Sequence, residues 1–188
     1  GSLSFQPSSG SYTLTGSTLE LGGGVNATVA SGGTATVNSV IAGSGGLTKG
    51  GAGLLILGGS NTFTGNVSVS QGTVQIASDA ALGNAGNDVA MTGTLKTTSN
   101  VTLGSGRDFT GSGNFSIAPG TTLTVNGSSA LVGTTLTDAG TLSLQGTGRS
   151  VGALTFNTAA RIEASGPVDR KSTRLNSSHA NISYAVFC

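Results

Sequence analysis

The sequence predicts an all-β protein wound as a three-sided parallel β-helix with about 20 residues per coil. Three observations lead to this fold class. Gly, Ser and Thr make up 86 of the 188 residues, and all three are poor helix formers. A Gly-x-apolar-x-apolar pattern recurs about every 20 residues, and two further apolar series keep the same interval. One unit repeated at such an interval is typical of a solenoid, whose coils bury their apolar faces against each other.

The first predicted strand of each coil follows a glycine. The pattern is clear over residues 53–57, 72–76, 113–117 and 152–156. The glycines that start the copies are Gly33, Gly53, Gly72, Gly93, Gly113, Gly133 and Gly152. Gly133 keeps the interval although Thr135 and Thr137 occupy its apolar positions. We expect these glycines at corners, where the backbone needs a positive φ or leaves no room for a Cβ atom.

The second and third predicted strands come from two other apolar series. The second series is Leu47, Val67, Val69, Val89, Met91, Phe109 and Leu131. The third is Val101, Leu103, Leu123, Val125, Leu142, Leu144 and Ile162. Apolar residues two positions apart indicate a short strand with one face inward. The alternative is a β-sandwich of hairpins, which would favour Asn-Gly or Asp-Gly turns, and only Asn126-Gly127 fits that pattern.

Composition and charge narrow the classes of function. Only 8% of the residues are charged and the net charge is +1, so no basic stripe supports nucleic-acid binding. The longest aliphatic run, Leu54–Leu57, is too short for a membrane-spanning helix. A single Cys cannot form an internal disulfide. The chain starts at Gly1-Ser2 without a signal-peptide pattern, so we expect it to be an internal segment of a longer protein.

Residues 45–83 contain the most specific motif of the chain. Leu47-Thr48-Lys49-Gly50 is followed by the Gly53–Leu57 strand and then by Asn61-Thr62-Phe63-Thr64-Gly65. These elements, in this order, resemble the autotransporter-associated β-strand repeat found in passenger domains of type V secreted proteins. Leu54 and Ile56 depart from that repeat, which usually has Thr or another polar residue there. Something is therefore expected to cover part of this outer face.

The resemblance implies a fold, a location and a role. It implies a right-handed parallel β-helix at the cell surface or outside a Gram-negative-type cell, with a C-terminal outer-membrane β-barrel as partner. The chain is then expected to be a structural stalk that assists its own export by folding coil by coil. The repeat carries no known catalytic residues, so we expect no enzyme activity, cofactor or metal. The alternatives are an adhesin that binds host or matrix glycans and a polysaccharide-active β-helix enzyme.

Carboxylates are the best candidates for the enzyme alternative. They are Asp79, Asp88, Asp108 and Asp138, with Arg107 as a charged neighbour. Asp88 and Asp108 are twenty residues apart, so we expect them to stack on adjacent coils, where two carboxylates can act as a pair. The competing interpretation is that these residues are solvated turn residues, for which Asp is favoured.

Other polar residues receive structural interpretations. Gly83–Asp88 resembles half of a calcium-binding nonapeptide and is interpreted as a turn, because one copy cannot share an ion between turns. Lys49 is expected to be an exposed corner residue. Asn61 is expected to hydrogen-bond a turn carbonyl or amide within the stack. The Thr-x-Thr pairs are irregularly spaced, so they do not indicate an ice-binding array.

A change in composition near residue 168 divides the chain into two predicted segments. Residues 1–168 are predicted to be the β-helix, and residues 169–188 a tail without Gly. The tail resembles a peptide that sequencing-adapter read-through adds to unrelated translations. The alternative is a capping segment in which Ile182, Tyr184 and Val186 alternate as in a strand. His179 and Cys188, the only His and Cys, both lie in this tail, so the β-helix has no residues for a Ser or Cys nucleophilic triad.

Overall fold

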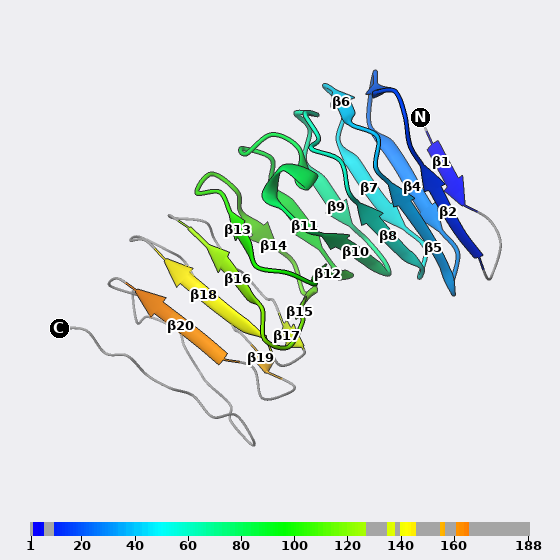
Figure 1. The fold of residues 1–188 in the computed structure, drawn as a ribbon. Coiled ribbons are helices and arrows are strands. Elements are labelled where there is room, and N and C mark those ends of the chain that lie inside the picture. Colours follow the sequence, from blue (N-terminus) through cyan, green and yellow to red (C-terminus); the bar gives the residue numbers. More distant parts are fainter. Residues whose placement is uncertain are drawn as a thin grey trace.

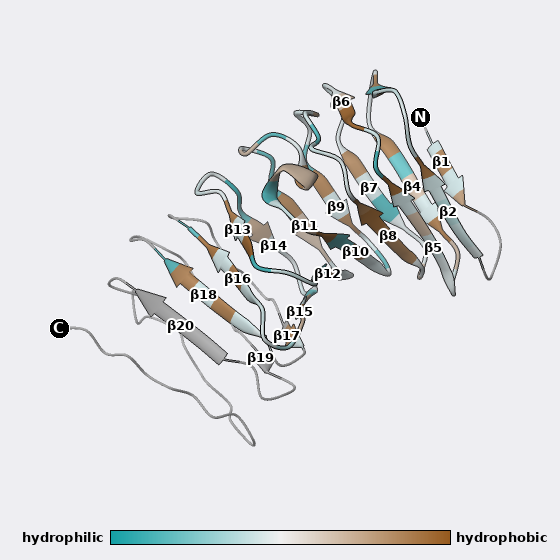
Figure 2. Ribbon diagram, viewed as in Figure 1, coloured by the Kyte–Doolittle hydropathy of each residue, from teal (hydrophilic) through white to brown (hydrophobic). Residues whose placement is uncertain are grey.

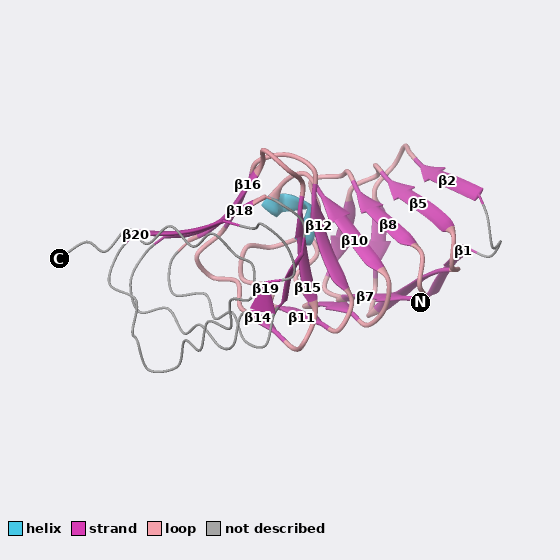
Figure 3. Cartoon of the chain, turned by 90° about the horizontal axis from the view of Figure 1, so that it is seen from below, coloured by secondary structure: helices cyan, strands magenta, loops and turns pink. Residues whose placement is uncertain are grey.

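The backbone winds into a parallel β-solenoid whose coils stack along one axis (Figures 1 and 3). A computed structural model describes residues 2–5, 10–126, 135–137, 140–145, 155–156 and 161–165. All strand pairs in these ranges are parallel, and each joins one coil to the next. The predicted all-β, three-sided solenoid is confirmed.

Three faces are formed by four sheets. Sheet A contains β1 (Ser2–Phe5), β4 (Val25–Val29), β7 (Leu47–Gly50), β9 (Val67–Val69), β11 (Val89–Met91) and β14 (Phe109–Thr110). Sheet B contains β2 (Gly10–Leu14), β5 (Gly33–Val37), β8 (Leu54–Leu57), β10 (Thr73–Ile76), β12 (Thr94–Thr97), β15 (Asn114–Ile117), β17 (Thr135–Thr137) and β19 (Thr155–Phe156). On the third face, sheet C contains β3 (Leu19–Leu21) and β6 (Ile41–Gly43), and sheet D contains β13 (Val101–Leu103), β16 (Thr122–Val125), β18 (Thr141–Gln145) and β20 (Arg161–Ser165).

The inward residues of successive coils form columns along the axis. The first column of register partners in sheet B is Ala35, Leu55, Val74, Leu95, Phe115, Leu136 and Phe156. Its members are 20, 19, 21, 20, 21 and 20 residues apart, which confirms the predicted interval. Hydrophobic and more hydrophilic bands alternate along strands such as β4 and β18 (Figure 2), as expected where one face of a strand is buried.

Near the C-terminal end of sheet B, the glycines no longer lie two positions before the first apolar residue of the strand. Leu136 pairs with Phe115, and Phe156 pairs with Leu136. Leu136 is buried, so the prediction that gave this inward position to Thr135 is wrong. The assignment of Phe156 to the second position of the pattern is also wrong, because its backbone is in register with Leu136 at the first position. Register follows the buried apolar side chain, because a one-residue slip would turn it outward. Gly133 and Gly152 themselves lie outside the described residues, as does Leu131.

Corner glycines explain how tightly the coils stack. Gly51 has φ of +70°, and a Cβ atom placed there would lie 2.3 Å from the carbonyl oxygen of Val29. At Gly53 a Cβ atom would lie 2.3 Å from the carbonyl oxygen of Ala30. Gly51 therefore needs both a left-handed backbone and an absent side chain, whereas Gly53 needs only the space.

The two residues that depart from the repeat lie on the outer face of sheet B. Leu54 and Ile56 point outward and are half-buried. Leu54 lies in register between Thr34 and Thr73 of the adjacent coils. The expected cover is thus supplied in part by the neighbouring strands of the same sheet.

The third face is interrupted between β6 and β13, where three strands per coil were predicted. Residues 61–64 lie on β6 without forming a strand: Thr62 N donates to Ile41 O at 2.8 Å, and Thr64 N donates to Gly43 O at 3.0 Å. In the next coil a short 3₁₀ turn, η1 (Asp79–Leu82), occupies this face. The interruption leaves backbone carbonyls without a regular ladder, so side chains must supply their donors.

Residues 169–188 lie outside the described ranges, and the predicted boundary at residue 168 stays a prediction. No helix within the described part of the chain has the length and apolarity needed to cross a membrane.

Candidate functional site

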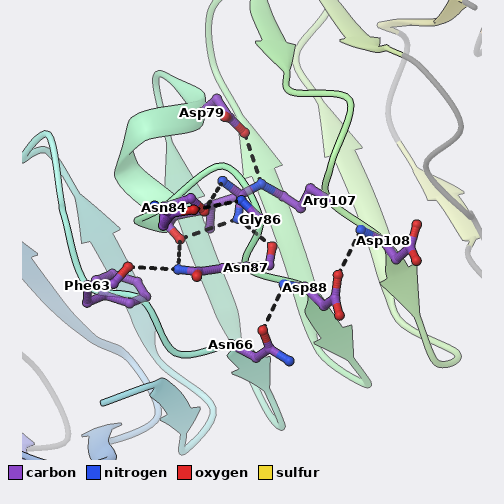
Figure 4. Close-up of polar contacts among 10 residues, drawn as sticks. Phe63, Asn66, Asp79, Asn84, Gly86, Asn87, Asp88, Arg107 and Asp108 are labelled. Atoms are coloured by element: carbon purple, nitrogen blue, oxygen red, sulfur yellow. Dashed lines mark hydrogen bonds and ion pairs between the residues drawn. The ribbon is translucent and has the colours of Figure 1, made fainter. Parts of the chain in front are cut away.

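The break in the third face gathers a cluster of polar contacts around Arg107 (Figure 4). Arg107 has an exposed fraction of 0%. Its Nε lies 3.0 Å from Asp79 Oδ1, which is the one ion pair among the described residues. Its Nη1 donates to Asn87 O at 2.7 Å and Leu82 O at 3.4 Å, and its Nη2 donates to Asn84 O at 3.1 Å.

These contacts make Arg107 the anchor of residues 79–88. A guanidinium presents its N–H donors in a rigid fork, which suits several carbonyls converging from one loop. Four of the five N–H donors of Arg107 are used by these partners, all of which lie in residues 79–88.

Two buried asparagines hold the same region to the coils beneath it. The Asn61 side chain accepts from Ile41 N at 2.8 Å and donates to Ala81 O at 2.6 Å, so it bridges three successive coils. The predicted role of Asn61 is confirmed. Asn87 Nδ2 donates to Phe63 O at 2.9 Å and to Leu82 O at 3.2 Å. Side-chain amides thus replace the missing ladder bonds on this face.

Asp88 and Asp108 stack on adjacent coils as predicted. Asn66 Oδ1 accepts from Asp88 N at 3.0 Å, and Asp88 Oδ1 accepts from Asp108 N at 3.2 Å. Figure 4 shows this line of three side chains running along the axis. Asp88 is half-buried and Asp108 is exposed. The geometry is that of turn residues capping backbone amides, and Asp138 lies outside the described residues.

The segment Gly83–Asp88 forms the predicted turn. Gly86 N donates to Asn84 Oδ1 at 3.0 Å, which closes an Asx turn. Within the part of the chain that the structure describes, no group of three or more His, Cys, Asp and Glu side chains is arranged to hold a metal ion. His179 and Cys188 lie outside that part.

Lys49 is buried, so the prediction of an exposed corner residue is wrong. Its exposed fraction is 0%, and its Nζ donates to Gly51 O at 2.6 Å, to Gly50 O at 2.8 Å and to Gln71 O at 3.3 Å. Burial lowers the pKa of Lys49 from 10.5 to about 8. Strand alternation contained the signal, because Lys49 follows the inward Leu47 by two positions.

Comparisons with known proteins agree with this architecture. Residues 47–76 match the passenger-associated-transport-repeat family. The chain is 35% identical over 168 residues to the adhesin BmaC autotransporter of Brucella suis biovar 1 (strain 1330), an alignment that covers 89% of the chain. The chain spans 4% of the length of that relative. No solved structure matches. The repeat match, the similarity to an autotransporter and the solenoid together place the chain among the autotransporter passenger repeat proteins.

Proposed function

We propose that the chain is a structural stalk of an autotransporter passenger and assists its own export by folding coil by coil. The observation that carries this proposal is the pairing pattern, in which each described strand pairs with strands of the preceding or following coil and with no others that the structure describes. A newly emerged coil can therefore dock on the coil before it without waiting for distant sequence. Passenger membership implies a secreted or cell-surface location and a C-terminal outer-membrane barrel as partner.

Export of matched variants tests this role. Residues 1–168 would be joined to an autotransporter barrel in a Gram-negative host, and surface exposure would be measured by protease accessibility on intact cells. Val74→Asp places a charge in the core column, where burial of an unpaired charge is costly, and we expect severalfold lower surface exposure. Gln75→Asp, on the outer face of the same strand β10, is the control. Equal exposure of the two variants would contradict the export role.

A second candidate is an adhesin that binds host or matrix glycans, and the similarity to a protein named as an adhesin favours it. Binding of the folded chain to a glycan array would support this role. Absence of binding to the array and to host cells, with the fold intact by circular dichroism, would leave the stalk role alone.

We propose that the chain is not an enzyme, because Asp88 and Arg107 hydrogen-bond backbone groups and Asp79 pairs with Arg107. Asp88→Asn and Asp108→Asn, assayed on a panel of polysaccharides beside the unsubstituted chain, test this. Hydrolysis or elimination by the unsubstituted chain that either variant loses would contradict the proposal.

A further inference from the structure

Lys49 occupies a position that is otherwise reserved for apolar side chains. It lies in the second inward column of sheet A, whose other members are Leu3, Ala27, Val69 and Met91. Ala27, the residue in register with Lys49 on the preceding coil, has the smallest side chain of the column. The lysine stem therefore has room at this level of the stack, beside Val69 of the following coil.

The ammonium group joins the corners of two coils. Gly50 O is the last carbonyl of β7, Gly51 O belongs to the corner that follows it, and Gln71 O belongs to the corner that follows β9. An ammonium has three N–H donors and no acceptor, so these three carbonyls use all of its donors. A main-chain hydrogen bond joins the same two coils, because Ser70 N donates to Lys49 O at 3.0 Å.

Strand alternation does not disfavour a register slip of two residues. A slip of one residue turns every inward side chain outward and is strongly disfavoured. A slip of two residues keeps each side chain on its own face. Sliding β7 by two residues against β9 would place Lys49 opposite Val67 instead of Val69, roughly 7 Å farther from the Gln71 corner. The ammonium would then lose Gln71 O while remaining inside an apolar column.

We propose that Lys49 is a register pin, which selects the native alignment of β7 with β9 by matching its ammonium to the carbonyls of both corners. A buried polar group at a core position specifies alignment at a cost in stability. Burial penalises the charged form of this amine, as its lowered pKa shows, so the lysine is retained at a cost that an apolar residue would not carry. This inference is independent of the export and adhesin roles.

Disulfide trapping during refolding tests the pin in a Cys188→Ser background. The pair Thr48→Cys with Ser68→Cys reports the native register, in which the two Cα atoms are direct partners. The pair Gly50→Cys with Ser68→Cys reports the two-residue slip, because these positions are too far apart for a disulfide in the native register. Both chains would be refolded under oxidising conditions, and the cross-linked peptides would be quantified by mass spectrometry.

The expected result separates Lys49 from other lysines. With Lys49 present, the slipped cross-link forms in trace amounts. In Lys49→Met it increases about tenfold or more, because the slip no longer breaks a hydrogen bond of a charged group, while circular dichroism and denaturant stability are unchanged or improved. Lys96→Met, on the outer face of β12, is the matched control and should leave the slipped cross-link at its original level.

Two outcomes would overturn the proposal. One is a Lys49→Met chain that folds and forms the native cross-link alone, since register would then be set without the lysine. The other is loss of folding in both Lys49→Met and the second variant, Lys49→Leu, because Lys49 would then be needed for stability instead of alignment.

Discussion

Thr97 is a buried residue whose hydroxyl weakens the core. It lies in the second inward column of sheet B, in register between Ile76 and Ile117. Its exposed fraction is 0%, and within the described ranges its Oγ1 has no hydrogen-bond partner. A buried hydroxyl that loses its water without gaining a partner costs free energy.

We therefore predict that Thr97→Val stabilises the solenoid by about 1 kcal/mol. Valine has nearly the same shape, so the substitution removes the hydroxyl without opening a cavity. Urea unfolding followed by circular dichroism measures the change. Thr94→Val, on the outer face of the same strand β12, should change the free energy little. Destabilisation by Thr97→Val would indicate that the hydroxyl has an unseen partner, such as a buried water.

At Lys49 the prediction concerns pH. The pKa is lowered from 10.5 to about 8 by burial, so between these values the unfolded chain holds a proton at Lys49 that the folded chain has released. Stability rises with pH wherever the unfolded state binds more protons. The contribution of Lys49 is thus fully present above 10.5 and is lost as the pH falls through about 8.

Comparison with Lys49→Met isolates the contribution of Lys49 to the pH dependence of stability, because the other groups titrate in both chains. We expect the difference in unfolding free energy to shift in favour of the lysine chain as the pH rises from about 8 to 10.5. Urea unfolding of both chains across this range measures it. A difference that is constant, or that shifts toward Lys49→Met, would show that the fold does not disfavour the charged amine.

At the scale of elements, residues 79–88 are held in large part by one side chain. Arg107 supplies donors to three carbonyls of this segment and pairs with Asp79. In Arg107→Lys the charge remains but the fork of donors is lost, and buried carbonyls are left without partners. We predict that amide hydrogen exchange in residues 79–88 accelerates roughly a hundredfold.

The comparison region is β8, whose amides should exchange at their original rate because Arg107 does not contact it. Asp108→Asn provides a matched polar substitution and should leave residues 79–88 protected. Unchanged exchange in Arg107→Lys would show that the asparagines hold the segment by themselves.

Strands were predictable here because each one is marked by its own apolar residues. The columns through Leu55, Val67 and Val101 follow directly from residues two apart and coils about 20 apart. The register near Leu136 was not predictable from the sequence. The glycines and the apolar residues recur at nearly the same interval, but near Leu136 the apolar series is shifted by one position relative to the glycines. The burial of Lys49 follows from alternation, although its charge suggested a surface residue.

The polar cluster was predictable only in part. The stacking of Asp88 on Asp108 follows from the repeat interval, and the hydrogen bonds of Asn61 follow from its place in a stacked motif. The environment of Arg107 does not follow from either rule. Its acceptors are main-chain carbonyls of an irregular segment, and their positions depend on the path of that segment and not on the identities of its residues.

At the scale of the whole molecule, the solenoid is nearly one-dimensional. Each coil contacts its two neighbours, so stability is approximately the sum of coil terms and nearest-neighbour interface terms. A defect in one coil should therefore weaken its own two interfaces and leave distant coils close to their original stability. A globular core would instead distribute the loss over all elements in one cooperative transition.

Leu95→Ala distinguishes these two behaviours. Leu95 has an exposed fraction of 0% and lies in register between Val74 and Phe115, so its truncation is expected to cost about 2–5 kcal/mol. We predict faster amide exchange in β10, β12 and β15 and little change in β4, which lies three coils away. Lys96→Ala, the outward neighbour, controls for loss of side-chain length on the same strand. A uniform increase in exchange from β1 to β16 would mean that the coils unfold as one cooperative unit, and coil-by-coil folding would then lack the local stability on which it depends.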